Sequence, residues 1–369
     1  MNEAMLTYQP PDVSPPGETL RDLMEERALS QAELARRLGR PSQAINEIVA
    51  GKKEITEDTA LELERVLQVP AHFWLAREAR YREFLARQRD ERSCEQQLPW
   101  VNQFPLKALQ EAGQLPAGRL TPAFKAQLVD PLLRFFGVAS PEGFKAQYGQ
   151  MQTQFRFAKP KQQTDTAAIS AWLRMGELAA AALPTAPYSA AKFEAALPAM
   201  RAFTVRPAPE IGPALVALSA AVGVALVFVP ALPGTHVSGV ARWLNGKPLI
   251  QLSLLGKWND AFWFSFFHEV GHILKHPVRS VFLDDSAAAD AVQSPEEQEA
   301  NRFAEDMLLP KALRQELQAL PLTQASVQAF AKKAQIHPGI VVGQLQHRGR
   351  IGYGDALTKL KQRYEHVAA

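Results

Sequence analysis

The chain has one cysteine, Cys94, among its 369 residues, and its formal net charge is only +3. A single thiol cannot form an internal disulfide, and the sequence has no Cys-x-x-Cys pair to hold a metal ion. We therefore expect a cytoplasmic protein whose fold does not depend on disulfides. The small net charge excludes a uniformly basic surface for nucleic acid, so any contact with DNA must come from a local patch.

Recognisable targeting and membrane segments are also missing. Residues 1–17 are Pro-rich, lack a basic region followed by an apolar run, and are expected to form a flexible tail. Residues 214–230 carry no charge and approach the length of a membrane span. Gly223 divides this stretch into an Ala- and Leu-rich half typical of a helix and a β-branched half typical of a strand. We interpret it as a helix followed by a buried strand, and we expect no membrane partner.

Changes of pattern along the chain predict a multidomain, mainly α protein. After the tail, the sequence indicates five short helices, a helical connector and a mixed α+β region, at residues 18–92, 93–205 and 206–369. In the mixed region two strand-like runs, 237–244 and 247–255, flank Asn245-Gly246, which is a strong signal for a β-hairpin. A long helix with an unusual motif follows this hairpin.

That helix contains HExxH, from His268 to His272. Histidines four residues apart share one helix face, so both imidazoles can reach one ion, and Zn²⁺ suits imidazole ligands. Glu269, beside the first histidine, is placed to act as the catalytic base that takes a proton from water. The alternative is a buried helix whose histidines bond to the backbone. Two histidines and a glutamate beside the apolar run before them would be costly to bury without a partner such as a metal.

A zinc site needs a third ligand, and the sequence offers two candidates. His276 lies about 12 Å along the helix from His268, which is too far for one ion, so we interpret it as a helix-terminal histidine. Glu297 borders the apolar stripe of a predicted helix at 294–310, and we favour it as the ligand. Asn301 is one turn later on the same side, placed to hydrogen-bond a ligand histidine.

The alternative to a ligand role for Glu297 is a structural one, as part of a capping box. Ser294-Pro295-Glu296-Glu297 fits Ser at the N-cap, Pro at the first helical position and Glu at the third. In the same way His337-Pro338 fits a polar helix start better than a donor to a reaction intermediate.

The paired motifs HEVGH and E-x-x-A-N-x-F-A-x-x-x-L-L-P resemble the ImmA/IrrE family of metallopeptidases, over about residues 210–350. The resemblance implies a gluzincin-like core in which His268, His272 and Glu297 hold Zn²⁺ and Glu269 is the catalytic base. It implies a zinc metalloendopeptidase that cleaves a repressor or antitoxin-like regulatory protein. A second hypothesis stays open, a non-enzymatic antitoxin-like transcriptional repressor whose zinc site is structural or sensory.

Residues 29–56 predict a helix-turn-helix unit. Ser30-x-x-Glu33 is a capping box that opens the first helix, Gly39 makes the turn, and a second helix runs to about Ala50. Candidate base contacts on the outward face of the second helix are Ser42, Gln43, Asn46 and Glu47. Candidate phosphate contacts are Gln31, Arg36, Lys52 and Lys53.

Charge argues against a DNA-binding role for this unit, because acidic residues slightly outnumber basic ones over the first 92 positions and phosphate contacts supply most DNA affinity. A small helical interaction domain is therefore the alternative. The pattern over about residues 15–85 nonetheless resembles XRE-type helix-turn-helix domains of the HigA-like antitoxin subgroup, with Pro41 where a capping Ser or Thr is common. The resemblance implies a double-stranded DNA operator as partner. It also implies a homodimer, since such domains usually read palindromes as dimers.

Overall fold

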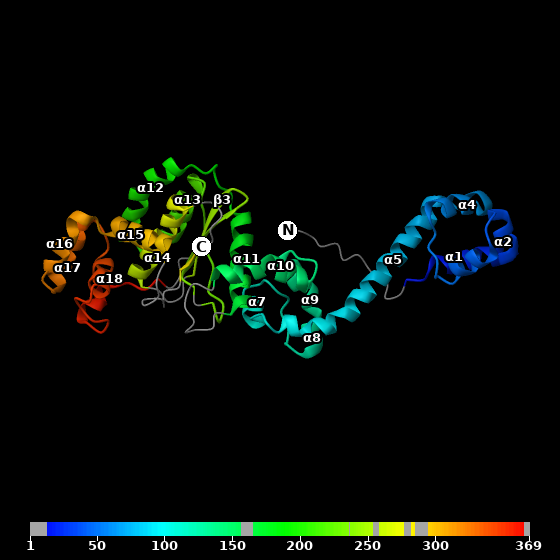
Figure 1. The fold of residues 1–369 in the computed structure, drawn as a ribbon, viewed down its shortest axis with the longest axis horizontal. Coiled ribbons are helices and arrows are strands. Elements are labelled where there is room, and N and C mark those ends of the chain that lie inside the picture. The colour runs from blue at the N-terminus through cyan, green and yellow to red at the C-terminus, as the bar shows by residue number, and fades with distance from the viewer. Residues whose placement is uncertain are drawn as a thin grey trace. The chain divides into compact units, whose positions relative to one another are not determined.

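The computed structural model describes residues 13–155, 165–235, 237–253, 258–276, 282–284 and 294–364. The chain forms two compact units, Met1–Gln97 and Leu98–Ala369 (Figure 1). Most of the described residues are helical, and one small sheet lies in the second unit.

The described part of the N-terminal unit is all helical, with α1 (Pro16–Glu26), α2 (Gln31–Leu38), α3 (Ser42–Val49), α4 (Glu57–Leu67) and α5 (Ala71–Cys94). Residues 1–12 of the expected tail lie outside the described residues, and α1 begins within the remainder of that segment. The prediction of five helices is confirmed, although α5 is longer than expected. Leu34, Ile45 and Trp74 are fully buried where these helices meet.

Local sequence signals set the α2–α3 connection. The Ser30 side chain accepts a hydrogen bond from the Glu33 N–H at 3.1 Å, as the predicted N-cap requires. Gly39 ends α2 with φ of 65°, a left-handed conformation that glycine adopts at little cost. Pro41 precedes α3 and supplies no side-chain cap. The predicted helix-turn-helix geometry is therefore present, with an uncapped entry to its second helix.

The second unit begins with a run of helices, which covers much of the helical connector predicted at residues 93–205 and extends past it. These are α6 (Leu98–Val101), α7 (Leu106–Glu111), α8 (Pro122–Gln127), α9 (Val129–Phe136), α10 (Pro141–Phe155), α11 (Thr166–Ala182), α12 (Ala190–Ala202) and α13 (Ala208–Ala221). Aromatic rings form the core of the helical part that precedes α11. Phe104, Phe136 and Phe144 contact one another there, with ring centroids 4.7–5.3 Å apart.

The sheet has the strand order β1-β3-β2-β4. Its strands are β1 (Ala225–Phe228), β2 (Gly239–Leu244), β3 (Lys247–Leu252) and β4 (Phe282–Asp284), and only the β1–β3 pair among them is parallel. Asn245 and Gly246 have φ of 51° and 81°, so the predicted two-residue hairpin is confirmed. The division of 214–230 into helix α13 and strand β1 is also confirmed. Within the described residues, no helix combines the length and the apolar character needed to cross a membrane.

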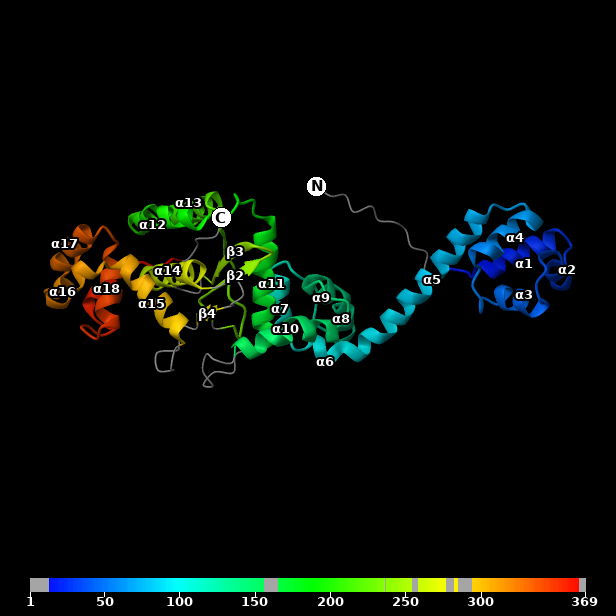
Figure 2. The ribbon, with the colours of Figure 1, turned by 45° about the horizontal axis from the view of Figure 1, so that its top comes forward.

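Helix α11 covers one face of the sheet (Figure 2). Because side chains alternate along a strand, Arg242 of β2 and Gln251 of β3 point to this face. Arg242 is almost fully buried and donates to the Glu177 carboxylate at 2.8 Å, while Gln251 donates to the Trp172 carbonyl at 2.6 Å. Residues of the expected connector and of the expected protease region therefore pack together within this unit.

The long helix α14 (Asn259–Lys275) packs on the opposite face, against β2 and β3. This helix buries four aromatic side chains of its own in the core, which explains the apolar run before HExxH: Phe262, Trp263, Phe266 and Phe267. It is followed by α15 (Pro295–Leu308), α16 (Lys311–Ala319), α17 (Gln324–Ala334) and α18 (Pro338–His347). The helix α14 is thus enclosed, and its polar residues lie in a mostly apolar setting.

Helices α17 and α18 repeat the backbone pattern of α2 and α3, a repeat that the sequence analysis did not predict. Each pair has a three-residue connection that starts with a left-handed residue, Gly39 with φ of 65° or Gln335 with φ of 55°. The side chain of His337 caps α18 by accepting the Gly339 N–H at 3.0 Å, which confirms the helix-start interpretation. Helix α18 packs against α14 and is largely buried, so it has no open face like that of α3.

Candidate metal centre and nucleic-acid interface

The candidate metal centre depends on a close crossing of α14 and α15. At Gly271 an added Cβ would stand 3.2 Å from Cα of Ala300 and 3.3 Å from the Phe303 side chain. Glycine at the fourth position of the motif therefore lets the two helix backbones approach closely. The approach brings the first turn of α15, which carries Glu297, over the turn of α14 that carries both histidines.

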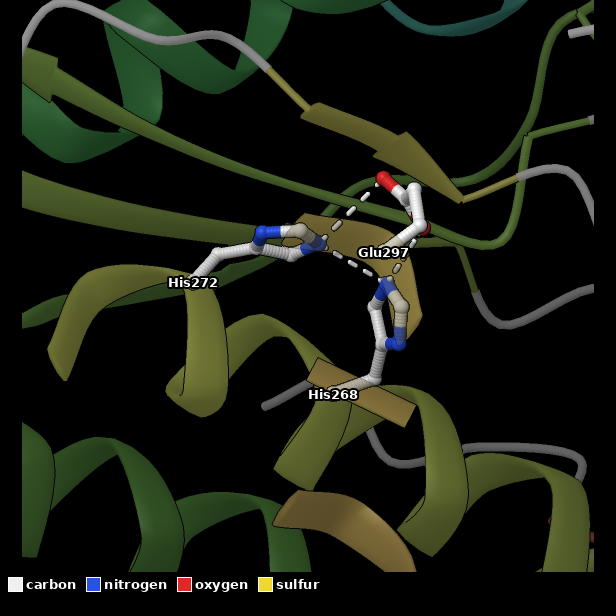
Figure 3. Close-up of side chains that lie close together, drawn as sticks. All are labelled: His268, His272 and Glu297. Atoms are coloured by element: carbon white, nitrogen blue, oxygen red, sulfur yellow. Dashed lines mark hydrogen bonds and ion pairs between the residues drawn. The ribbon is translucent and has the colours of Figure 1, made fainter. Parts of the chain in front are cut away.

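Figure 3 shows that His268, His272 and Glu297 point toward one another. The two imidazole Nε2 atoms are 2.9 Å apart, and the Glu297 carboxylate oxygens lie 3.2 Å and 3.4 Å from Nε2 of His268 and His272. Their ligand atoms all lie within 4.8 Å of one another, and no other such group of His, Cys, Asp or Glu occurs among the described residues. The structure thus places together the three residues predicted as ligands.

Burial and hydrogen bonding set the charge of this cluster. Burial raises the pKa of Glu297, but hydrogen bonds and charge from His268 and His272 outweigh it and hold the pKa at about 2. Burial chiefly lowers the pKa of His272, which favours the neutral form of that imidazole. An ionised carboxylate and a neutral imidazole are the protonation states in which these groups bind a metal.

Asn301 lies where the sequence placed it, one turn after Glu297. Its Oδ1 accepts a hydrogen bond from Nδ1 of His268 at 2.9 Å. With the proton held at Nδ1, a neutral His268 presents the lone pair of Nε2 to the cluster. One half of the capping-box alternative is present, because Ser294 accepts the Glu297 N–H at 3.2 Å. The Glu297 carboxylate faces the histidines rather than the Ser294 N–H, so the N-cap and the metal-ligand interpretation do not exclude each other.

Glu269 is fully buried on α14, beside the start of the inner strand β2. An added Cβ at Gly239 of β2 would stand 2.8 Å from Oε1 of Glu269, so this strand position holds the carboxylate closely only because it lacks a side chain. A role is predicted from the sequence for Glu269 but not for Gly239. The signal for Gly239 is its place at the start of a strand, where a glycine often marks the close approach of another group to the backbone.

The donor set fits Zn²⁺. Two imidazole nitrogens and one carboxylate converge from two helices, which is a combination found in catalytic zinc sites. When His268 donates from Nδ1 to Asn301, its Nε2 carries a lone pair, and this nitrogen lies 2.9 Å from Nε2 of His272, close enough for both to reach one ion. The three side chains are therefore chemically suited to hold the ion. Their roles as ligands, and that of Glu269 as base, stay predictions.

His276 was predicted to be only a helix-terminal residue, yet it contacts the cluster. Its Nδ1 is 2.9 Å from Nδ1 of His272, and its Nε2 is 3.5 Å from the Glu299 carboxylate. The distance along the helix excludes His276 as a ligand to the same ion, but it allows a contact through the other ring nitrogen of His272.

The candidate DNA contacts lie on the surface of the α2–α3 unit. Ser42, Gln43 and Asn46 are exposed on α3, and Glu47 is partly exposed. Gln43 donates to the Glu47 carboxylate at 3.0 Å, so these two side chains are held together on the outer face. The remaining candidates are Gln31, which is partly exposed, and Arg36, Lys52 and Lys53, which are exposed. The role of each of these candidate residues in binding DNA stays a prediction.

Arg36 has an internal partner that the sequence analysis did not anticipate. Its guanidinium pairs with the Glu33 carboxylate, and Arg37 donates to the same carboxylate at 2.7 Å. These bonds lower the pKa of Glu33, the bond from Arg37 more than that from Arg36. Because the pairs are exposed, a phosphate group can compete with Glu33 for Arg36.

Comparison with known proteins identifies the class of the N-terminal unit. Residues 20–74 match the helix-turn-helix family, so this part of the chain is a helix-turn-helix domain. The match agrees with the α2–α3 geometry and with the buried residues that join these helices. No curated protein matches the chain.

Solved structures similar to part of the chain include an antidote protein of a plasmid maintenance system from Nostoc punctiforme, with 29% identity over 22% of this chain and 91% of its own, at a TM-score of 0.22. An addiction module antidote protein of the HigA family from Coxiella burnetii has 29% identity, covering 23% of this chain and 92% of its own, at a TM-score of 0.21. PA4674 from Pseudomonas aeruginosa, solved with its operator DNA, has 33% identity over 20% of this chain and 82% of its own, at a TM-score of 0.20.

Proposed function

We propose that this protein is a DNA-binding transcriptional regulator that carries a zinc-dependent endopeptidase site. The observation that carries the proposal is the convergence of His268, His272 and Glu297, with buried Glu269 next to the first histidine. The helix-turn-helix domain and the exposed polar face of α3 support the DNA-binding part.

His268, His272 and Glu297 would hold the metal. When bound there, Zn²⁺ supplies a Lewis acid and lowers the pKa of water. Glu269 accepts a proton from the attacking water and returns it to the leaving amine, which completes hydrolysis of a peptide bond. Asn301 holds the His268 ring by accepting its Nδ1 proton. The apolar packing of α14 limits the access of bulk water to the carboxylate of Glu269.

The proposed substrate is a repressor or antitoxin-like regulatory protein, as the resemblance to the ImmA/IrrE family implies. In this proposal the helix-turn-helix domain binds an operator as a homodimer and holds the peptidase near proteins that act at the same DNA. The runner-up function is a non-enzymatic repressor with a structural or sensory zinc site. The buried carboxylate of Glu269 favours the enzyme, since a structural site has no need of a base beside its ligands.

The experiment compares cells that make the wild-type protein with cells that make Glu269→Gln, which keeps the size of the side chain. New protein N-termini are identified by mass spectrometry before and after DNA damage, and the zinc content of both purified proteins is measured. We expect both proteins to hold zinc and only the wild type to produce new N-termini from a regulatory protein. If Glu269→Gln retains full control of transcription and no cleavage depends on Glu269, the endopeptidase is rejected and the repressor function stands.

A further inference from the structure

His276 lies directly behind His272, on the side away from Glu297. Its backbone N–H donates to the His272 carbonyl at 3.1 Å, at the C-terminal end of α14. This bond keeps residue 276 one turn after residue 272 and turns its ring toward the same face. The two Nδ1 atoms are 2.9 Å apart, and the His276 side chain is almost fully buried.

A hydrogen bond between two Nδ1 atoms needs a proton on one of them and a lone pair on the other. If His272 uses the lone pair of Nε2 to bind a metal, its proton must be on Nδ1. His276 then accepts at Nδ1 and carries its own proton on Nε2. That nitrogen faces the Glu299 carboxylate at 3.5 Å, which is an acceptor.

We propose that His276 and Glu299 are positioning residues for the proposed zinc site, and the inference therefore rests on the proposed function. Glu299 orients His276, and His276 holds the proton of His272 on Nδ1, so that the Nε2 lone pair of His272 points to the metal. Asn301 does the same for His268. Both histidine ligands thus have an acceptor behind them, and such acceptors usually change metal affinity by 10–100-fold when removed.

The two partners of His272 do not contribute equally. The His276 side chain is 4% exposed, so water cannot readily replace the acceptor that it provides. The Glu299 side chain is 53% exposed, and water can take over part of its electrostatic contact with His276. We therefore expect the loss of His276 to matter more than the loss of Glu299.

The test measures zinc affinity of the full-length protein by competition with a chromogenic chelator. We expect His276→Ala to weaken zinc binding by roughly 10–100-fold, and Glu299→Ala to weaken it by less. His276→Gln should recover much of the loss, because its side-chain oxygen can accept the Nδ1 proton. Matched controls are His347→Ala and Glu316→Ala, which remove an exposed histidine and a carboxylate paired with Lys333 elsewhere in the unit.

A second readout is the tautomer of His272 in the zinc-free protein, from ¹⁵N spectra of its imidazole. The wild type should carry the proton on Nδ1, and His276→Ala should lose that preference while its melting temperature stays near that of the controls. Wild-type affinity in His276→Ala, or a proton on Nε2 of His272 in the wild type, overturns the positioning role and leaves the zinc site standing. A wild-type protein that binds no zinc overturns both.

Discussion

Gly239 of strand β2 lies against Glu269 of helix α14, so closely that an added Cβ would stand 2.8 Å from the carboxylate Oε1. It would also stand 2.8 Å from Cδ2 of Leu252 on the neighbouring strand. The strand backbone therefore forms one wall around the proposed base. A side chain at this position would have to displace both the carboxylate and the buried leucine.

Gly239→Ala is predicted to lower peptidase activity by roughly 100-fold while zinc content stays near that of the wild type, because it shifts the base rather than the ligands. Hydrolysis of the identified protein substrate and the zinc content are measured on the same preparation. Gly352→Ala is the matched control, since nothing lies within 4 Å of a Cβ added there. Full activity in a correctly folded Gly239→Ala protein would show that the carboxylate of Glu269 needs no fixed position.

Asn301→Ala is predicted to weaken zinc binding by roughly 10–100-fold, because His268 loses the acceptor that holds its proton on Nδ1. Chelator competition provides the measurement. Asn301→Asp keeps an acceptor at the same distance and should bind zinc more tightly than the alanine variant. Equal affinities for all three proteins would contradict the role given to Asn301.

Lys52→Ala and Lys53→Ala are each predicted to weaken operator binding similarly for all sequences. Each should reduce the slope of log affinity against log salt by about 1, since a phosphate contact releases condensed counterions. Asn46→Ala should instead cost about 1–3 kcal/mol on the operator and little on unrelated DNA, as expected for a base contact. Fluorescence anisotropy over a salt series separates these effects. An unchanged slope for both lysine variants would remove Lys52 and Lys53 from the interface.

Tyr364 is predicted to make folding sensitive to alkaline pH. Burial raises its pKa to about 12, and the hydrogen bond that it accepts from Trp263 offsets this only in part. Since the folded pKa is above that of the unfolded chain, the contribution to stability is complete below pH 10 and is lost as the pH rises through 12. Compared with Tyr364→Phe, the wild type should lose about 2 kcal/mol more unfolding free energy between pH 9 and pH 12. Denaturant unfolding at the two pH values measures this difference, and identical losses in both proteins would contradict it.

Much of the local structure was predictable because it depends on short-range rules. The four-residue spacing of His268 and His272 puts both on one helix face, and Asn245-Gly246 requires the positive φ values that a tight hairpin uses. Glu297 and Asn301 were predicted from the same helical period. Their position against the histidines was inferred from the need for a third zinc ligand and from the resemblance, since periodicity within α15 does not say which helix it meets.

The parts that were not predicted depend on contacts between distant segments. The parallel pairing of β1 with β3 and the packing of α11 on the sheet have no local signal. The glycine at the start of β2 indicates a close approach, but it does not indicate that Glu269 is the group that approaches. His276 was missed for a different reason. The distance along the helix excludes it as a ligand to the same ion, but a histidine has two ring nitrogens and can act on the site through the second one.

The most direct test of the central claim is zinc K-edge X-ray absorption of the purified full-length protein, compared with Glu297→Ala. The account predicts one zinc ion per chain with two imidazole nitrogens and a carboxylate oxygen at about 2.0–2.2 Å. It also predicts that Glu297→Ala loses the carboxylate from this shell and binds zinc much more weakly. A wild-type protein without bound zinc, or an identical coordination shell in Glu297→Ala, would contradict the claim.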